Sequence, residues 1–536
     1  MSETAVIVLA AGQGTRMKSR RAKVLHELCG LPMLGHVLRT ARALSPSRLL
    51  VVIGRDAEEV RARFRGEAEF VLQAEQKGTG HAVRVAEPTL GPVTGDVLVL
   101  YGDTPLLRPE TIEHMSAVKR ERNADLVILT ARTQNIPGII VRDEPGRVVR
   151  IVESQDATDS ELAIEERNTG VYLMSADLLR EGLAKLEPNN AQGELYITDI
   201  VAFAVELGRV VEGASIDDPD ECMGINTRSQ LADAAAFMRR RIVDGLMDDG
   251  VSFIDPDSVY IDADVRIGRD SLIEPGVVIS GASILGERVH VKAGCVIEDS
   301  RLDDDVAIGP SAHLRPGSRL GAGVKIGNFV EIKNSSLGPG TKAAHLGYIG
   351  DADVGAGVNF SCGAIVVNYD GYRKSRSTIG DNAFIGCNAN IVSPLTVEPH
   401  GFVAAGSTVT KDVPGDALAV ARSRQRNIEG WVARKEGRAP PGAGEGTGTQ
   451  SAVPASDSVR KTAKTASVRR PARKKTAVKK RTVKKAVKKK AAGKKPAKKK
   501  AAKKKAMKKS GARKSAVRKN AARKSSRRKA AKRARR

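Results

Sequence analysis

The first residues that could do chemistry follow an apolar segment near the start of the chain. Ala5 to Leu9 is uninterrupted, and Ala10-Ala-Gly-Gln-Gly-Thr-Arg-Met17 comes directly after it. A strand, a glycine turn and a helix in this order are how a doubly wound α/β sheet begins. Glycines at 12 and 14 let backbone N–H groups approach an anion, while Arg16 and Lys23 can meet phosphate charge. The alternative is a glycine turn that serves packing alone.

A carboxylate follows a second apolar run. Val97-Leu-Val-Leu-Tyr-Gly-Asp103 ends at Asp103, and the carboxyl edge of a parallel sheet is where such proteins bind ligands. Beside a triphosphate, a lone Asp is a natural Mg²⁺ ligand. The other interpretation is that Asp103 caps a helix beginning after Thr104-Pro105.

A second set of polar residues lies where a regular aliphatic pattern is interrupted. Its members are Lys333, His345, Tyr348, Asn359, Asn368, Tyr369 and Asp370. No packing reason gathers them, and functional groups often occupy the place where a regular pattern breaks.

The pattern on either side is a six-residue aliphatic repeat. It comprises Ile267, Ile273, Ile279, Leu285, Val291, Ile297, then Ile308, Leu314, Leu320, Ile326, Ile332, and last Ile379, Ile385, Ile391, Val397, Val403, Val409. A period of six fits short parallel strands that turn a corner after each hexapeptide, with one aliphatic side chain per strand pointing inward. The repeat therefore predicts a parallel β-helix of triangular section.

Two further elements complete the expected scaffold. Apolar runs at Ala5–Leu9, Leu49–Ile53, Val97–Leu100 and Leu126–Thr130 alternate with helical patterns, which predicts a Rossmann-like, mostly parallel sheet. From Arg228 to about Met247 apolar residues follow the helical period, and a helix of about 20 residues spans about 30 Å. We interpret it as a strut between two domains; a partner-binding helix is the alternative.

Length and charge divide the chain further. At 536 residues it exceeds the roughly 250–300 residues at which one core stops growing. Residues 460–536 hold 39 Lys and Arg and no Asp or Glu, so the remainder carries a net charge of −12. The expected segments are 1–227 (α/β domain), 228–249 (linker helix), 250–436 (β-helix) and 437–536 (a disordered Lys/Arg-rich tail).

The cysteines and the apolar segments bear on location. Cys29, Cys222, Cys295, Cys362 and Cys387 are scattered without C-x-x-C spacing, which favours free thiols in a reducing compartment. Ala5 to Ala11 lacks the basic flank and length of a secretion signal, and no stretch reaches membrane-spanning length. We expect a cytoplasmic protein without a membrane span.

Several motifs together resemble a known family. They are Leu9-Ala-Ala-Gly-Gln-Gly-Thr-Arg-Met17, Lys23-Val-Leu-His26, Leu72-Gln-Ala-Glu-Gln-Lys-Gly-Thr-Gly-His-Ala82, Tyr101-Gly-Asp103, Ile151-Val-Glu153, Asn168-Thr-Gly170 and Asn190-Ala-Gln-Gly-Glu194. In this order they resemble sugar-1-phosphate nucleotidyltransferases, and best the bacterial bifunctional N-acetylglucosamine-1-phosphate uridylyltransferase / glucosamine-1-phosphate N-acetyltransferase family. The resemblance covers nearly all of residues 1–435. It implies UDP-N-acetylglucosamine synthesis for peptidoglycan and lipopolysaccharide.

The resemblance assigns roles in the first domain. Arg16 and Lys23 would act on the phosphates, with Arg16 on the leaving diphosphate, and Gln73, Gly78 and Thr79 would read the uracil of UTP. Gly138, Glu153 and Asn168 would hold N-acetylglucosamine-1-phosphate, and Asp103 and Asn226 would ligate Mg²⁺. The whole nucleotide-sugar set is Leu9, Ala10, Ala11, Gly12, Lys23, Gln73, Gly78, Thr79, Tyr101, Gly102, Asp103, Gly138, Glu153, Asn168 and Asn226. Without the resemblance, Asn226 could equally open the next helix.

In the repeat the resemblance implies a left-handed, homotrimeric coil that acetylates glucosamine-1-phosphate from acetyl-CoA. His345 would be the general base, because imidazole exchanges protons near neutral pH. Taken alone, it could be a solvated surface histidine. Arg315, Lys333, Tyr348 and Asn359 would bind glucosamine-1-phosphate, and Cys362, Asn368, Tyr369, Cys387, Ala405 and Arg422 would contact acetyl-CoA.

The chain departs from the family pattern at several places. Ile136-Pro-Gly-Ile-Ile140 stands where the family has Gly-Tyr-Gly-Arg-Ile, and Arg21-Ala-Lys23 where it has Leu-Pro-Lys. Cys362 and Cys387 replace Ala and Ser. We interpret both as small buried thiols at coil corners rather than nucleophiles, because direct acetyl transfer needs no acyl-enzyme.

The tail is a separate question. Lys494-Lys-Pro-Ala-Lys-Lys-Lys-Ala501 resembles histone-like Lys/Ala-rich segments. We expect it to bind nucleic acid or another polyanion non-specifically; a solvated tail without a ligand is the alternative. For the whole chain, a nucleotidyltransferase of another sugar-1-phosphate with a merely structural coil, and an architectural nucleic-acid-binding protein, are the competing hypotheses.

Overall fold

The computed structural model describes residues 3–54, 56–134, 136–144, 146–154, 157–188 and 193–438. Contacts between residues divide the chain into Met1–Ile428 and Glu429–Arg536. Nearly all of the second unit, including the predicted tail from 439 onward, lies outside the described residues; its described part holds the short helix α9 (Trp431–Lys435).

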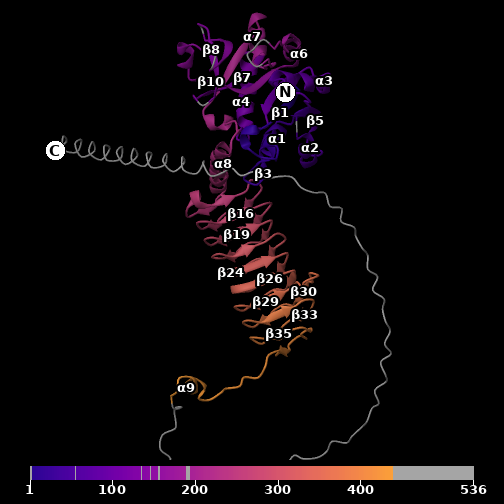
Figure 1. Ribbon diagram of the computed structural model, residues 1–536, viewed down its shortest axis with the longest axis vertical. Helices are drawn as coiled ribbons and strands as arrows, with labels where there is room; N and C mark the ends of the chain where they lie inside the picture. The colour runs from indigo at the N-terminus through magenta and orange to yellow at the C-terminus, as the bar shows by residue number, and fades with distance from the viewer. Residues whose placement is uncertain are drawn as a thin grey trace, which may run out of the picture. The chain divides into compact units, whose positions relative to one another are not determined.

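The first half of the chain is a nine-stranded sheet between helices (Figure 1). Its strands are β1 (Thr4–Ala10), β4 (Arg48–Ile53), β5 (Glu69–Leu72), β6 (Asp96–Tyr101), β7 (Leu126–Arg132), β8 (Gly138–Arg142), β9 (Val148–Glu153), β10 (Glu166–Ser175) and β11 (Val211–Ile216). The main order is β11-β7-β10-β6-β1-β4-β5, and β10 runs antiparallel to both neighbours. The four predicted strands and the mostly parallel α/β sheet are confirmed.

The central strand β1 is apolar throughout because both of its faces are covered. Ala5, Ile7 and Leu9 pack into one core, while Val6, Val8 and Ala10 pack into the other. The first core includes residues of α3 (Thr79–Leu90), α6 (Ala176–Lys185) and α7 (Asp199–Glu206); the second includes residues of α1 (Met33–Ala43), α2 (Ala57–Arg63) and α4 (Pro109–Glu121). The remaining short elements of this half are α5 (Asp159–Leu162), β2 (Glu27–Leu28) and β3 (Leu31–Pro32).

The sequence predicted that the glycine turn after β1 leads into an α-helix, and this prediction is wrong. A three-residue 3-10 helix, η1 (Thr15–Met17), follows it, and a second one, η2 (Lys23–Leu25), carries Lys23. The residues flanking η1, Gly14 and Lys18, have φ angles of 61° and 50°. Because left-handed residues at both ends cannot continue an α-helix, the chain makes an open turn there.

The predicted connecting helix is confirmed as α8 (Arg228–Asp248). Thr227 caps it in a reciprocal arrangement with Gln230. Ala234 and Met238 pack against residues of the α/β layer, whereas Val243 belongs to the core of the coil. One face of the helix therefore packs against residues of its own chain.

From residue 252 the chain forms a parallel β-helix (Figure 1). Its strands are β12 (Ser252–Phe253), β13 (Tyr260–Ile261), β14 (Arg266–Ile267), β15 (Leu272–Ile273), β16 (Val278–Ser280), β17 (Ile284–Leu285), β18 (His290–Val291), β19 (Val296–Glu298), β20 (Arg301–Leu302), β21 (Ala307–Ile308), β22 (His313–Leu314), β23 (Arg319–Leu320), β24 (Lys325–Lys333), β25 (Ser336–Leu337), β26 (Lys342–Gly350), β27 (Ala352–Val354), β28 (Asn359–Phe360), β29 (Ile365–Val367), β30 (Ser377–Ile379), β31 (Phe384–Ile385), β32 (Asn390–Val392), β33 (Thr396–Val397), β34 (Phe402–Val403), β35 (Thr408–Val409) and β36 (Leu418–Ala419). All seventeen residues of the predicted aliphatic ladder are buried in its single core.

Parallel pairing stacks the strands in three ladders, which gives the predicted triangular section. Ile273 pairs with Val291, eighteen residues or three hexapeptides later. Near the break in the repeat, Phe360 pairs with Ile385, twenty-five residues later. The extra residues leave the coil between β29 and β30, so the lost phase in the sequence marks a loop and not a change of fold.

Two strands are much longer than the rest. β24 and β26 have nine residues each and pass through a corner of the coil instead of ending there. At that corner Phe329 and Leu346 have φ angles of 56° and 42°. Large apolar residues rarely adopt this conformation, so this corner differs from the others of the coil, where residues with positive φ are Gly or polar residues such as Arg288 and Asn334.

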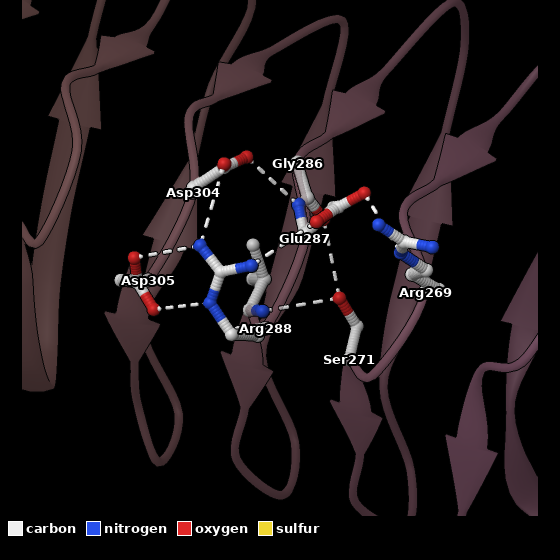
Figure 2. Close-up of polar contacts among 8 residues, drawn as sticks. Arg269, Ser271, Gly286, Glu287, Arg288, Asp304 and Asp305 are labelled. Carbon is white, nitrogen blue, oxygen red and sulfur yellow. Dashed lines mark hydrogen bonds and ion pairs between the residues drawn. The ribbon is translucent and has the colours of Figure 1, made fainter.

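Another corner shows how an ordinary turn of the coil is held. Figure 2 shows Arg288 between the carboxylates of Asp305 and Asp304, with Nε donating to Asp305 Oδ1 at 2.8 Å. Ser271 accepts the backbone N–H of Val289 at 3.0 Å and donates to the carbonyl of Gly286. Exposed ion pairs contribute little to stability, so the buried Ser271 bonds and the aliphatic core hold the corner.

Candidate active sites

A pocket of about 270 Å³ opens where the parallel strands β5, β4, β1 and β6 end. It is lined by Leu9, Ala10, Ala11, Gly12, Lys23, Val24, Gln73, Gln76, Gly78, Thr79, Ala82, Tyr101, Asp103 and Glu194. Ten of these are residues that the sequence assigned to nucleotide-sugar binding. The position is the one expected for a ligand of an open α/β sheet.

A small cation-centred cluster lies at one side of this pocket. The Lys23 ammonium donates to the carboxylate of Asp103 and, at 3.1 Å, to Asn226 Oδ1. The carbonyl of Asp103 accepts the N–H of Ile225 at 2.9 Å, which fixes Asn226 beside it. Neither residue caps a helix, because α4 begins after Arg108 and α8 is capped by Thr227. The Lys23 ammonium thus contacts two side-chain oxygen atoms that come from distant segments of the chain.

The opposite side of the pocket presents an amide. Gln73 is 3% exposed, and its Nε2 donates to the carbonyl of Gly78 at 3.1 Å. Gly78 has φ 99°, and a Cβ there would stand 2.4 Å from the carbonyl oxygen of Leu195, so only glycine fits. A buried, oriented amide can read the polar edge of a pyrimidine.

A third group extends from the pocket toward the antiparallel part of the sheet. Gly138 pairs with Glu153 across β8 and β9, and the Asn168 side chain lies against Gly138. Asn168 donates to the hydroxyl of Tyr172 at 2.8 Å. Tyr101 connects this group with the pocket: burial first, then the charges of Asp103 and Glu153, raise the pKa of its hydroxyl. The side chain therefore stays neutral.

Some predicted residues lie outside the pocket wall, and some wall residues were missed. Arg16 is exposed on η1, and neither it nor Gly102 lines the pocket. Gln76 and Glu194 do line it. Both belong to motifs that carried the family resemblance. Their place in those motifs could have identified them as pocket residues. Residues 190–192 of the motif ending at Glu194 lie outside the described part of the chain.

On the coil, His345 lies at the corner crossed by β24 and β26. It is exposed, in register with Asn328, and its Nδ1 lies 2.9 Å from Asn328 Oδ1. An amide oxygen only accepts, so Nδ1 carries the proton and Nε2 is left able to accept one. Sequence reasoning missed Asn328, although it precedes His345 by one coil turn.

The phosphate-binding residues proposed from sequence lie on the face that follows this corner. The backbone N–H of Arg315 donates to the carbonyl of Ile332 at 2.8 Å, which places Arg315 beside Lys333 on adjacent turns. Lys374, which the sequence did not single out, faces Lys333 from the loop between β29 and β30. The side-chain hydrogen bond with Lys374, and then its charge, lower the pKa of the Lys333 ammonium. Three cationic side chains gathered in this way can attract an anion.

The residues that the sequence predicts to bind the sugar and acetyl-CoA flank the same corner. Tyr348 is in register with Glu331, which accepts from Arg315 Nη1 at 2.9 Å. Asn359 lies on the other ladder, and its Nδ2 donates to Ser361 at 3.2 Å. The structure therefore places Tyr348 and Asn359 on two faces of the coil, with His345 between them.

The residues that the sequence predicts to contact acetyl-CoA fall into two groups. Asn368 and Tyr369 begin the loop between β29 and β30. There Asn368 donates to Asp351, and Tyr369 donates to the carbonyl of Gly371. Cys362, Cys387 and Ala405 occupy successive turns below His345: the carbonyls of Cys362 and Cys387 accept the N–H of Asn388 and of Gly406. Arg422 lies against Gly406 at the end of this row.

The expectation that Cys362 and Cys387 are buried is wrong. Both are exposed, because the corner positions they occupy point outward, whereas the core takes the apolar residue two positions earlier, Phe360 or Ile385. Cys222 and Cys295 are the buried thiols, and Cys29 is partly covered.

Fold and sites together define a nucleotidyltransferase joined to a hexapeptide-repeat acyltransferase. The family model for the MobA-like NTP transferase domain matches residues 6–189, and that for the bacterial transferase hexapeptide, six repeats, matches residues 264–299. The chain is 48% identical to the bifunctional protein GlmU of Pelobacter propionicus, over 81% of this chain and 99% of the relative. It is 46% identical to that of Trichlorobacter lovleyi, over 81% and 99%, and 46% identical to that of Brevibacillus brevis, over 80% and 96%.

The chain therefore belongs to the GlmU family of bifunctional proteins. It is a bifunctional enzyme of UDP-N-acetylglucosamine synthesis, with a uridylyltransferase and an N-acetyltransferase activity. In the part of the chain that the structure describes, none of the helices is both long and apolar enough to cross a membrane.

Proposed function

We propose that the pocket of the α/β domain transfers UMP from UTP to N-acetylglucosamine-1-phosphate. The carrying observation is the convergence of Lys23, Asp103 and Asn226 at the sheet edge. The turn after β1 and Lys23 hold the UTP phosphates, and Gln73 reads uracil. A phosphate oxygen of the sugar attacks the α-phosphorus, the bond to the bridging oxygen breaks, and diphosphate leaves toward Arg16. Alignment and charge supply the rate.

The donor set at this pocket fits Mg²⁺. Asp103 and Asn226 offer one carboxylate and one amide oxygen around a common cation position. Mg²⁺ is commonly held by one or two protein oxygens together with substrate phosphates. When bound there, it would neutralise phosphate charge. The described residues contain no cluster of three or more His, Cys, Asp or Glu side chains that could hold a metal without substrate.

The coil acetylates glucosamine-1-phosphate in this proposal. His345 Nε2 takes a proton from the sugar ammonium, and Asn328 keeps the imidazole in the required tautomer. The amine attacks the thioester carbonyl of acetyl-CoA, the carbon–sulfur bond breaks, and CoA leaves as the thiol. Arg315 and Lys333 bind the sugar phosphate, Tyr348 and Asn359 orient the ring, and Cys362, Asn368, Tyr369, Cys387, Ala405 and Arg422 line the acetyl-CoA groove. N-Acetylglucosamine-1-phosphate then passes to the first site.

An assay of the full-length chain tests both assignments. With UTP and N-acetylglucosamine-1-phosphate it should release diphosphate, and with acetyl-CoA and glucosamine-1-phosphate it should release CoA. EDTA should stop the first reaction and leave the second unchanged. Preference for another sugar-1-phosphate or nucleotide, with no CoA release, would favour a nucleotidyltransferase with a structural coil.

The coil is proposed to act as a homotrimer. Phe329 and Leu346, beside His345, are 61% and 60% exposed in one chain. Exposed apolar side chains next to a catalytic group are typical of a protein–protein interface. A second copy of the chain would bury them and close the open site. Light scattering should give three chains per particle for the native protein and fewer for Phe329→Ser; a native monomer with full acetyl transfer would contradict this.

The remaining assignments concern the segment limits, location and tail. Domain limits near 227, 249 and 436 and a cytoplasmic location stay part of the proposal. The basic segment from Arg460 would bind nucleic acid or other polyanions through its Lys and Arg. A gel-shift series should show DNA binding by the full chain, weakening steeply with salt, and none by a chain ending near residue 455. Equal binding by both would contradict it.

A further inference from the structure

Cys362 and Cys387 stand directly one above the other on neighbouring turns of the coil. On one side of them Asn359 pairs with Phe384, and on the other Ile365 pairs with Asn390. Both pairs have the same offset of twenty-five residues, so the register is unbroken across the corner and Cys362 faces Cys387. The N–H of Asn388, which follows Cys387, donates to the Cys362 carbonyl at 2.9 Å.

The same reasoning places this pair directly below His345. Ala343 pairs with Phe360 and Tyr348 with Ile365, again with one offset on both sides of the corner. His345 therefore faces Cys362. The corner residues form a single outward column: Asn328, His345, Cys362, Cys387 and Ala405.

The pair differs from the other thiols of the chain in accessibility. Both side chains are exposed. Burial raises the pKa of Cys29 to about 11 and that of Cys222 to about 12, and it also raises the pKa of Cys295. Since the thiolate is the reactive form, these three thiols are poor competitors for an oxidant.

We propose that Cys362 and Cys387 are a reversible oxidation site, closed to a disulfide by a low-molecular-weight disulfide of the glutathione class. In-register residues of adjacent parallel strands lie about 4.8 Å apart, within the Cα separation of about 4.4–6.8 Å that a disulfide spans. The Cβ atoms must approach to about 3.8 Å, a small movement for exposed corner side chains. An exposed disulfide of this kind is readily reduced again.

The exchange balances without any other reactant. One cysteine thiolate attacks the oxidant disulfide, a mixed disulfide forms, and one small thiolate leaves. The second cysteine thiolate then attacks the protein sulfur of the mixed disulfide, and the second small thiolate leaves. The two cysteines lose two electrons and two protons, and the oxidant is reduced to two thiols.

The consequence for catalysis rests on the proposed acetyl-CoA groove. A disulfide would draw together two side chains of its wall immediately below His345. Misplacement by about 1 Å near reacting groups can cost up to about 10²-fold in rate. Oxidation should therefore slow acetyl transfer by about tenfold or more, while the nucleotide pocket, whose lining contains no cysteine, keeps its activity.

The test uses the full-length protein, treated with oxidised glutathione and digested without reduction. Trypsin cuts after Arg373, Lys374 and Arg376, between the two cysteines, so the disulfide joins two separate peptides that mass spectrometry identifies and dithiothreitol releases. We expect this linked pair within single chains on a non-reducing gel. Glutathione retained on one cysteine, linkage only between chains, or no linkage would overturn the proposal.

Variants separate this proposal from the assignment of the groove. In Cys387→Ser the ratio of oxidised to reduced acetyl-transfer rate should rise to one, whereas the matched variant Cys29→Ser should retain the linked peptides and the loss of rate. The regulatory role would be overturned if oxidation still slowed acetyl transfer in Cys387→Ser. It would also be overturned if the wild-type protein kept its full rate with the two cysteines completely linked. If the groove assignment itself fails, linkage still forms in the wild-type protein and His345→Ala leaves acetyl transfer unchanged.

Discussion

The two candidate sites of this chain are built in opposite ways. The nucleotide pocket is concave and gathers Gly12, Gln73, Asp103 and Glu194 from four loops at one sheet edge. The acetyl-transfer site is an exposed corner, with His345 in a column whose members repeat at the period of the coil. The first is nearly complete in one chain, whereas the second lies open.

The two sites position their side chains by different physical means. In the pocket, neighbours such as Lys23 and Asn226 are fixed by long-range packing, so each wall residue depends on the whole sheet. In the coil, neighbours such as Asn328 and His345 are fixed by the register of two adjacent strands. Each turn contacts only the turns above and below it. A substitution at one site should therefore leave the activity of the other site unchanged.

The largest effect should come from His345→Ala. Loss of the general base should slow acetyl transfer by about 10²–10⁴-fold, with uridylyl transfer unchanged. CoA release and diphosphate release, measured on one preparation, check this. As a matched positioning variant, Asn328→Ala should slow the reaction less and change its pH profile. Equal loss of both activities in His345→Ala would mean that the sites are not independent.

Asp103→Ala should do the reverse. Removing one of the two oxygen ligands proposed for Mg²⁺ weakens the placement of positive charge at the phosphates. This should slow uridylyl transfer by about 10²–10³-fold. Acetyl transfer should keep its full rate because the coil has its own core. A steady-state assay at several Mg²⁺ concentrations should show a raised metal requirement. An unchanged requirement would remove Asp103 from the metal site.

Ile297→Ala tests whether the coil depends on its inward ladder. Ile297 is fully buried in the coil core, and truncating a buried Ile costs about 2–5 kcal/mol. Denaturant unfolding should show this loss in the coil, with acetyl transfer weakened before uridylyl transfer. If both activities were lost at the same denaturant concentration, the coil and the α/β domain would unfold as one unit.

The smallest effect should come from Arg288→Ala, also in the coil. Arg288 pairs with three carboxylates but lies at an exposed corner (Figure 2), where solvent and salt screen such pairs. The unfolding midpoint should stay within measurement error at high and low salt. A shift comparable to that of Ile297→Ala would show that corner charges, and not the aliphatic ladder, hold the turns together.

The reach of sequence reasoning followed the same division. The aliphatic period located the coil core and the break that contains His345, because inward and outward positions repeat with the chain. The glycine turn and Asp103 located the pocket edge. Gln76 escaped notice as a wall residue, and the turn after β1 proved to be a 3-10 helix, because both depend on contacts made by distant segments.

The α/β sheet, the helix α8, the hexapeptide coil and the family could all be predicted from the sequence, since each rests on local period or on motif order. Only the tertiary structure decided that Lys23 joins Asp103 to Asn226, that Asn328 orients His345, and that Cys362 faces Cys387 at the surface. The physical reason is register. Successive turns of the coil have pairing offsets of twenty-five and of eighteen residues, and only strand pairing shows which side chains then meet.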